Sequence, residues 1–373
     1  MKRKLLALAV AGAFLAPAAA MADGSGIVLT GVIHGDIGFG REKTSGGTEV
    51  YKRQANIGTF ATRWEIDGTE DLGWSQAIFG LAMDQKFAGA GPESSTSTGG
   101  GSPTNNNNGN GLNNRNSYLG LTGGWGTLKI GQNEHRYEIQ QIVQDPDPAS
   151  ESTYSTLSLM TNYGIAGLPG FTRRDPQSIW YTSPSFAGVT IDLAYITPGG
   201  RKSSTTSPSG IQVALSWASS FGLSLHTALA QYTDEGGNDN KNEAFRVGAG
   251  YGTELFQVDV FAEQLQFKDN DGGFLGAGDK LKRTNFGVSG DLNFGQHHIR
   301  AALSQGNKAK LNGSTIADSQ GRLLFLSYAF TLSKRTEFQV NFGKSDNKDN
   351  ATYNVSSGGN DSDRFGFGIR HTF

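Results

Sequence analysis

Three carboxylates lie close together in the short stretch QDPDPASES, where they could create a local negative potential. Asp145, Asp147 and Glu151 lie within it, and Pro146 and Pro148 stiffen the backbone between them. Such a cluster is either a solvated acidic turn or a fixed array of negative charge held opposite a cationic group. The choice between the two depends on the elements that position the stretch.

Residues that could perform catalysis or bind a metal are sparse. The sequence has no Gly-x-Ser-x-Gly and no His-Glu-x-x-His motif, and its six histidines are scattered. The run DNDGG at 269–273 is similar to a calcium loop, but Phe274 stands where the sixth-position glycine is required and the closing glutamate is missing. We therefore predict no enzyme, no metal and no cofactor.

Composition favours one large all-β unit over several ordinary domains. Of 373 residues 53 are glycine, 10 are proline and none is cysteine, and no Gly-x-y period is present. A chain without cysteine has no disulfide frame, so its stability must come from a hydrogen-bonded sheet and from packing.

The first 22 residues have the pattern of a cleaved signal peptide. Lys2, Arg3 and Lys4 precede an apolar stretch at 5–16, and Ala20-Met21-Ala22 provides the small residues of a cleavage site. An uncleaved anchor is the weaker alternative, because the apolar stretch is shorter than the roughly 20 residues that a spanning helix needs. We expect residues 23–373 to form a single exported domain.

The mature chain is mildly acidic. Loss of three cations leaves 29 Lys and Arg against 34 Asp and Glu, a net charge of about −5. This balance argues against a nucleic-acid partner, which would require a basic patch.

Apolar and polar residues alternate with period two along most of the chain. Phe256, Val258 and Val260 lie on one face of a predicted strand, whereas Gln257 and Asp259 lie on the other. The same division recurs in many further segments. We count 16 strands, with 14 or 18 as alternatives, each with about 22 residues for strand and connection.

Short turns and long polar loops alternate between these strands, which predicts an antiparallel up-and-down meander. Its long loops are expected at 41–52, 88–114, 133–176, 199–210, 234–242, 268–282, 309–319 and 347–361.

Two architectures share this pattern, a soluble sandwich and a closed transmembrane β-barrel. No repeat or linker divides the chain as several sandwich domains would require. Aromatic residues also lie near strand ends on the apolar face, as in girdles at membrane interfaces. They include Phe39, Phe60, Trp64, Tyr195, Trp217, Phe294, Phe330 and Phe342. We therefore predict a transmembrane barrel. It must be closed, because hydrocarbon offers no hydrogen-bond partner to an unpaired backbone group at a sheet edge.

Three arginines are candidates for the inner wall of this barrel. Arg63 alternates with Trp64, Arg115 is expected to share a face with Ser117, and Arg53 is expected to share the face of Arg63, above it in the channel. An unpaired arginine facing lipid would cost about 2–4 kcal/mol at the midplane, which favours the lumen.

Four stretches and the closing strand resemble the general trimeric porins of Gram-negative outer membranes. The stretches are TRWEIDGTEDLG at 62–73, RNSYLGL at 115–121, WGTLKIG at 125–131 and YTSPSFAG at 181–188. The resemblance implies a 16-stranded homotrimeric barrel in the cell outer membrane that passes small hydrophilic solutes and ions by passive diffusion.

The same resemblance assigns roles to the charged residues. In these porins the third extracellular loop folds into the lumen, and its acidic residues face a basic wall. The loop at 133–176 is the longest here, which would give Asp145, Asp147 and Glu151 the acidic role opposite Arg53, Arg63 and Arg115. The remaining partners implied are outer-membrane lipid, lipopolysaccharide and the assembly machinery, which would recognise the terminal Phe373.

Two other functions remain possible on the same barrel. One is a substrate-specific channel, although few lumen aromatics beyond Trp180 and Phe261 are expected to form a sugar slide. The other is an adhesin that displays its loops.

Overall fold

The structure is a computed structural model, and it describes most of the chain beyond the first 24 residues. The described residues are 25–58, 62–85, 112–134, 137, 159–171, 173–197, 208–235, 237, 239–353, 355 and 357–373. The signal peptide and Asp145, Asp147 and Glu151 lie outside them.

Nineteen strand segments make up the described wall. They are β1 (Gly26–Lys43), β2 (Glu49–Gly58), β3 (Arg63–Asp71), β4 (Gln76–Gln85), β5 (Leu112–Gly123), β6 (Gly126–Glu134), β7 (Arg174–Thr182), β8 (Val189–Ile196), β9 (Ser209–Ala218), β10 (Leu223–Thr233), β11 (Lys241–Gly252), β12 (Phe256–Lys268), β13 (Lys280–Phe294), β14 (His297–Gly306), β15 (Lys310–Leu311), β16 (Ser314–Thr315), β17 (Gly321–Ser333), β18 (Thr336–Asn347) and β19 (Asp361–Thr372).

Seventeen of these segments form the sixteen strands of the barrel. Both β2 and β3 pair with β1, one after the other, so they are two halves of one strand. The short β15 and β16 form a hairpin inside a loop. The predicted count of sixteen strands is therefore confirmed.

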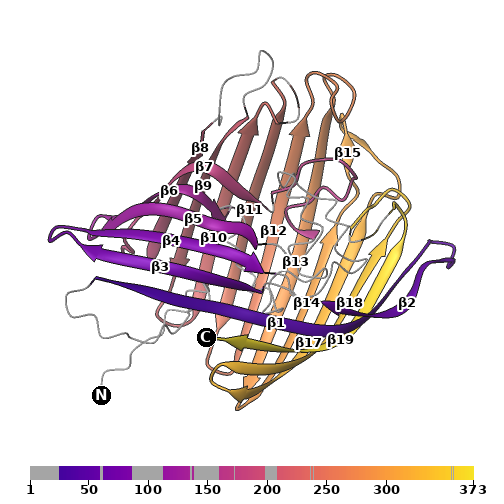
Figure 1. Cartoon of the computed structure of the whole chain (residues 1–373). Helices are drawn as coiled ribbons and strands as arrows, with labels where there is room; N and C mark the ends of the chain where they lie inside the picture. Colours follow the sequence, from indigo (N-terminus) through magenta and orange to yellow (C-terminus); the bar gives the residue numbers. More distant parts are fainter. Residues whose placement is uncertain are drawn as a thin grey trace.

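The sheet closes on itself through its first and last strands. Each wall strand is antiparallel to the next, and β19 returns to β1 with Val32 opposite Thr372 and Lys43 opposite Asp361. Figure 1 shows the tall strands of the later half beside the more tilted early strands. Closure leaves no free edge to pair with another chain, as the sequence predicted.

The apolar face of the wall points outward and the polar face points inward, which is the reverse of a water-soluble protein. On β12, Val258 and Val260 are 43% and 50% exposed, whereas Asp259 and Glu263 on the opposite face are buried. The exposed face is a surface suited to hydrocarbon. In the described part of the chain, no helix is long and apolar enough to span a membrane.

The first long loop is shorter than the sequence suggested. Strand β1 continues to Lys43 and β2 begins at Glu49, so the connection is 44–48 and not 41–52. The apolar alternation ends near Phe39, but backbone pairing continues beyond it, and Arg41 forms an ion pair with Asp363 on β19. Charged residues thus continue the strand beyond the end of the apolar alternation.

Candidate functional site: the inner wall and the inner segment

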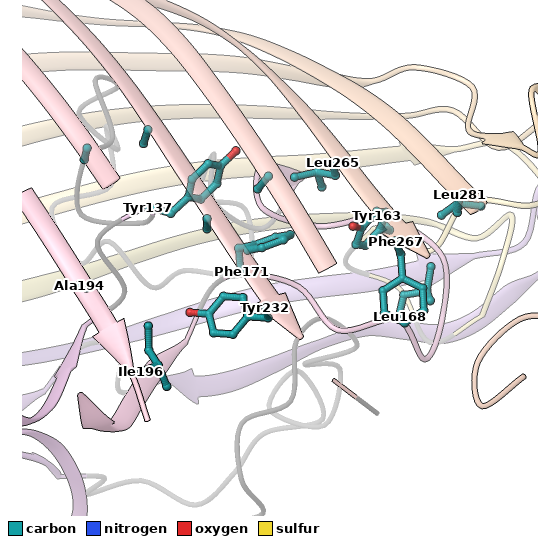
Figure 2. Packing of buried hydrophobic residues seen from close by; sticks show 14 of the residues in the cluster. Tyr137, Tyr163, Leu168, Phe171, Ala194, Ile196, Tyr232, Leu265, Phe267 and Leu281 are labelled. Carbon is teal, nitrogen blue, oxygen red and sulfur yellow. The ribbon is translucent and has the colours of Figure 1, made fainter. Parts of the chain in front are cut away.

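A group of residues from the long 133–176 connection packs against the inner face of the barrel. We call the described residues Tyr137 and 159–171 the inner segment. Its aromatic side chains cover small apolar residues of β8 to β11, which Figure 2 shows in part. The covered wall residues include Ala194, Ala214, Ala228, Ala230 and Ala244, all of them buried. Alanines on the inner face therefore provide the space in which the inner segment lies.

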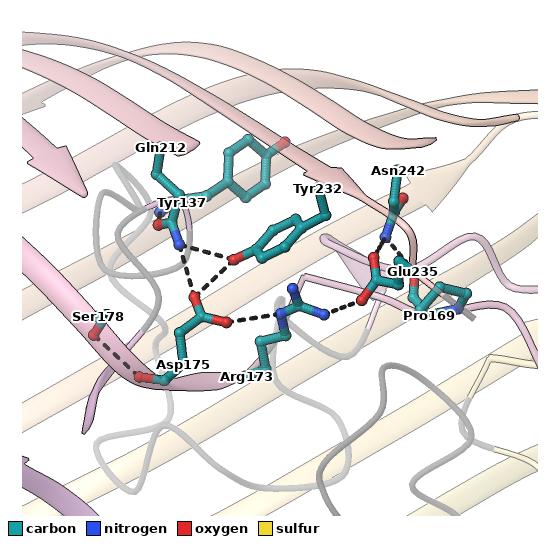
Figure 3. A network of polar contacts seen from close by, with 9 residues as sticks. All are labelled: Tyr137, Pro169, Arg173, Asp175, Ser178, Gln212, Tyr232, Glu235 and Asn242. Carbon is teal, nitrogen blue, oxygen red and sulfur yellow. Dashed lines mark hydrogen bonds and ion pairs between the residues drawn. The ribbon is translucent and has the colours of Figure 1, made fainter. Parts of the chain in front are cut away.

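Asp175 on β7 organises the first polar network beneath this segment (Figure 3). Its Oδ2 accepts hydrogen bonds from the Gln212 amide at 2.8 Å and from the Tyr232 hydroxyl at 2.7 Å. Its Oδ1 lies 3.1 Å from Nε of Arg173, whose guanidinium also pairs with Glu235. The buried carboxylate is thus satisfied by charge and by hydrogen bonds, as burial requires.

A backbone irregularity turns Asp175 inward. Gly131 pairs with Ser178, but Asn133 pairs with Asp175, so β7 carries one extra residue at this point. Gln177 adopts a left-handed conformation with φ of 56°. The resulting bulge reverses which side chains face the interior, as bulges commonly do.

Glu263 on β12 organises a second network. Its carboxylate pairs with Nη2 of Arg246 at 2.9 Å, and it accepts hydrogen bonds from Asn285 Nδ2 at 2.7 Å and from the Tyr137 hydroxyl at 2.8 Å. The backbone N–H of Thr161 also donates to it at 2.7 Å. Burial and then the negative charge of Glu263 raise the pKa of Tyr137 well above its usual value, so its hydroxyl stays protonated and donates.

Arg283 on β13 joins the inner segment to two later loops. Its guanidinium donates to the carbonyl oxygens of Tyr163 and Ser319, and to the Tyr353 hydroxyl at 2.6 Å. Burial raises the pKa of Tyr353 to about 12. Gly306, at the end of β14, leaves room for that ring, because a Cβ there would lie 2.2 Å from the Tyr353 oxygen.

Of the predicted wall arginines, Arg63 and Arg115 are on the inside. Arg63 lies opposite the buried Val32 and pairs with Glu65 at 2.6 Å. Arg115 is buried and pairs with Asp84 at 2.9 Å and with Glu134 at 3.5 Å.

The face expected for Ser117 was wrong, and a bulge explains why Arg115 nevertheless points inward. Ser117 lies opposite Leu81, whose side chain is 42% exposed on the outer face. The register then shifts, because Asn114 lies opposite Met83. The extra residue at this shift returns Arg115 to the interior.

Arg53 lies on the outer face, contrary to the expectation that it shares a face with Arg63. Ile37 is opposite Ile57, but Val32 is opposite Arg63, so the register slips by one residue between β2 and β3. A slip of one residue exchanges the two faces of a strand. Arg53 accordingly pairs with Asp363, which also binds Arg41.

Phe373 is tied to the first strand at the rim. Its backbone N–H donates to Gly31 O at 3.1 Å, and Gly31 N–H donates to Phe373 O at 3.2 Å. A Cβ on Gly31 would lie 2.3 Å from Cζ of the Phe373 ring, so glycine makes room for it.

The DNDGG run is a self-contained turn. Asp269 is buried, and its carboxylate accepts backbone hydrogen bonds from Gly272, Gly273, Phe274 and Leu275 at 2.6–3.2 Å. Both oxygens accept hydrogen bonds from N–H groups, so the backbone of the turn satisfies this buried carboxylate.

Several interior residues were not singled out from the sequence. Trp180 and Phe261 were expected inside and are buried there, but Tyr232, Phe325 and Tyr353 are buried as well. Glu263, Arg246 and Asp175 were also missed as site residues. For Arg246 and Glu263 the available signal was a charged residue on the polar face of an alternating strand, whereas the bulge in β7 removes that signal for Asp175.

A closed barrel with an apolar exterior and a charged interior defines an outer-membrane channel protein. The family model described as Gram-negative porin matches residues 7–350. The chain belongs to this family, and it is a diffusion channel of the Gram-negative outer membrane and not an enzyme.

Curated relatives are similar along the whole chain, and solved structures share its fold. The major outer membrane protein P.IB of Neisseria lactamica is 25% identical, with 100% of both chains covered. The anion-selective porin from Comamonas acidovorans is 20% identical with a TM-score of 0.71, covering 94% of this chain and all of that one. The loop L8 deletion mutant of OmpT from Vibrio cholerae has a TM-score of 0.69 at 12% identity, with 94% and 100% coverage.

Proposed function

We propose that the 133–176 connection folds inward and narrows a water-filled channel for small hydrophilic solutes and ions. The observation that carries this proposal is the anchoring of Tyr137 and Thr161 on the inner wall through Glu263. Asp145, Asp147 and Glu151 lie between these two anchors in the sequence. In this proposal they present negative charge at the constriction, opposite Arg63 and Arg115.

We expect a weak preference for cations. The mature chain has an excess of acidic residues, and Arg63 and Arg115 are each paired with a wall carboxylate. Such pairing reduces the positive potential that either arginine contributes to the lumen. The anion preference named for the Comamonas porin belongs to that protein, which shares 20% of residues with this one.

Neutralising the three loop carboxylates tests the constriction. The variant carries Asp145→Asn, Asp147→Asn and Glu151→Gln, and conductance and reversal potential are measured in planar bilayers under a salt gradient. We expect the reversal potential to shift toward anion preference and the conductance to change. Unchanged values in both measurements would remove these residues from the constriction.

A matched control removes the same charge elsewhere. Asp239, Asp318 and Asp349 are exposed in other loops, and each is changed to Asn. The control should leave the reversal potential close to that of the unmodified channel, because exposed charges are screened within about 10 Å at 0.1 M salt.

A substrate-specific channel receives less support from the interior. Trp180 and Phe261 are buried in clusters that include residues of the inner segment, such as Tyr137 and Leu159. Buried rings of this kind are occupied by packing and do not form an exposed sugar slide.

We further propose that the chain is exported with cleavage after Ala22 and assembles as a homotrimer. Trimers are typical of the family, and one solved neighbour is a trimer form of OmpT. Lipopolysaccharide and the outer-membrane assembly machinery are the remaining proposed partners. Mass measurement of the purified protein in detergent tests the trimer, since a monomer mass would contradict it.

A further inference from the structure

Four residues on adjacent strands form one row across the inner wall, at the end of the barrel that carries the long loops. Asn285 on β13 lies opposite Gly306 on β14. Gly321 on β17 is paired with Gly306 on one side and with Asn347 of β18 on the other. The two central positions have no side chain, so the row forms a slot between two asparagines.

Tyr353, from the loop that follows β18, lies in this slot and is fully buried. A Cβ on Gly321 would lie 2.4 Å from Cδ2 of its ring, and a Cβ on Gly306 would lie 2.2 Å from its hydroxyl oxygen. The hydroxyl accepts a hydrogen bond from Nη1 of Arg283 at 2.6 Å and donates to Oδ1 of Asn285 at 3.5 Å. The ring therefore crosses β17 and β14, and its hydroxyl reaches β13.

The backbone around Tyr353 is bound to the same wall. Its N–H donates to Oδ1 of Asn347 at 3.0 Å, and its carbonyl accepts from Nδ2 of Asn347 at 2.9 Å and from the Ser345 hydroxyl at 2.6 Å. The N–H of Thr352 donates to the Gly164 carbonyl of the inner segment at 3.0 Å. Ring and backbone together hold this loop on the inner side of the barrel.

The loop 348–360 is long enough to reach the channel axis. It has 13 residues, and the structure describes all of them except 354 and 356. Half of that length, extended at about 3.3 Å per residue, spans about 21 Å. Sixteen strands about 4.8 Å apart and tilted by about 40° enclose a barrel with a radius of about 16 Å. A loop inside the mouth therefore needs a contact that keeps it beside the wall.

We propose that Tyr353 is a positioning residue that latches the loop 348–360 to the inner wall, and that this latch keeps the channel open. When it is released, the loop is a lid at that end of the barrel. The proposal is independent of the proposed constriction by the 133–176 connection, because the slot belongs to the wall strands β13, β14, β17 and β18.

Emptying the slot should release the lid. Tyr353→Ala removes the ring and its hydrogen bonds. Single-channel recordings should then show closures at least ten times as frequent as in the unmodified channel, at an unchanged open level. Tyr251→Ala is the matched control, because that ring is 43% exposed on the outer face of β11. It should leave the frequency of closures unchanged.

Filling the slot from the wall should have the same effect while Tyr353 itself is kept. Gly321→Ala places a methyl group where the ring lies. Gly290→Ala on β13 is its control, because a Cβ there would lie 3.5 Å from its nearest non-adjacent atom, an ordinary contact. Tyr353→Phe keeps the proposal testable if the other variants do not fold. It removes only the hydroxyl and should give a smaller effect in the same direction. Folding is checked by the mobility difference between heated and unheated protein in gel electrophoresis.

A labelling experiment reads the latch without any current. The chain has no cysteine, and Ala351 is fully buried, so Ala351→Cys introduces a single buried thiol. Adding Tyr353→Ala should raise the rate of maleimide labelling at least tenfold, because the loop loses the ring that holds it. Adding Tyr251→Ala instead should leave the rate unchanged.

The two measurements separate the latch from the lid. Labelling and closures that rise together in Tyr353→Ala and Gly321→Ala, but not in the two controls, are the expected result. Faster labelling without additional closures would show that Tyr353 holds the loop but that the loop is not a lid, which overturns the proposal. Unchanged labelling and closures in the folded variants would overturn the latch as well.

Discussion

Arg364 on β19 and Asp36 on β1 form an ion pair across the closing seam of the barrel, with 2.5 Å between Nη2 and Oδ2. Both side chains are buried on the inner face. The neighbouring Gly38 has no side chain, and a Cβ there would lie 2.0 Å from Nη2 of Arg364. The seam therefore combines backbone pairing with a charge pair that needs a glycine beside it.

Asp36→Asn should destabilise the closed barrel. The substitution removes the charge of the carboxylate that accepts the 2.5 Å hydrogen bond from buried Arg364, and loss of such a charged hydrogen bond costs about 1.5–3 kcal/mol. We expect a lower midpoint for thermal unfolding in detergent, and Gly38→Ala should act in the same direction by displacing the guanidinium. The exposed pair of Lys344 and Asp346 is the control, because Asp346→Asn should change stability by less than about 1 kcal/mol. Equal midpoints for the two variants would contradict the role of the seam pair.

Deleting Phe373 should reduce assembly more than conductance. The residue exchanges two backbone hydrogen bonds with Gly31, and its ring occupies the space left by that glycine. It lies at the rim, so channels that do assemble should conduct normally. The measurement is the yield of folded protein in outer-membrane fractions, followed by conductance of the purified barrels. A normal yield of the truncated chain would disprove the prediction.

Acid should release the turn at 269–279. Burial alone would raise the pKa of Asp269, but four backbone hydrogen bonds outweigh it and lower the pKa to about 2. A lowered folded pKa stabilises the ionised form, so this contribution is complete above the ordinary value near 4 and is lost as the pH falls through about 2. Amide exchange protection at Gly272 and Leu275 should fall over that window. Asp269→Asn should show weak protection already at neutral pH, and retention of full protection would refute the assignment.

A cation on the outer face of β10 should prevent stable insertion. Leu229 lies near the middle of the strand and is 51% exposed, so Leu229→Arg would place its charge in hydrocarbon at a cost of about 2–4 kcal/mol. Folding free energy in lipid vesicles measures the effect. Leu229→Ser is the control and should cost less, because it adds no charge. An equal cost for both would argue against a lipid-facing position.

The number and order of strands could be predicted because alternation is a local property. Each strand repeats the same division between apolar and polar faces, and each short turn marks a reversal. The predicted strand that contains Phe256, Val258 and Val260 is β12 in the structure, which begins at Phe256. Its prediction required no knowledge of a distant residue.

The faces of particular residues could not be predicted where a bulge intervenes. Arg53 was assigned to the face of Arg63 by counting residues, but the extra residue between β2 and β3 reverses that count. Arg115 pointed inward for a reason other than the one inferred. A bulge is a backbone event whose position depends on pairing with the neighbouring strand, so alternation in one segment does not reveal it.

The interior networks depend on contacts between distant parts of the chain. Glu263 binds Tyr137 and Thr161, which are 126 and 102 residues away in the sequence. A carboxylate on the polar face of a strand is compatible with simple hydration until the partner is known. The alanines at 194, 214 and 228 weakly indicated that something packs against the inner wall, because small apolar residues are unexpected on a face that contacts only water.

The pairing of β1 with β19 also governs the order of events in folding. His34 lies opposite Arg370, so the contacts that complete the barrel join residues separated by nearly the whole sequence. Such contacts bear the largest entropic cost of loop closure and form slowly. Until they form, both terminal strands present unpaired backbone, and the chain is vulnerable to association with other copies. A carrier that shields the two strands until they pair would therefore determine the yield of folded protein, independently of the stability of the finished barrel.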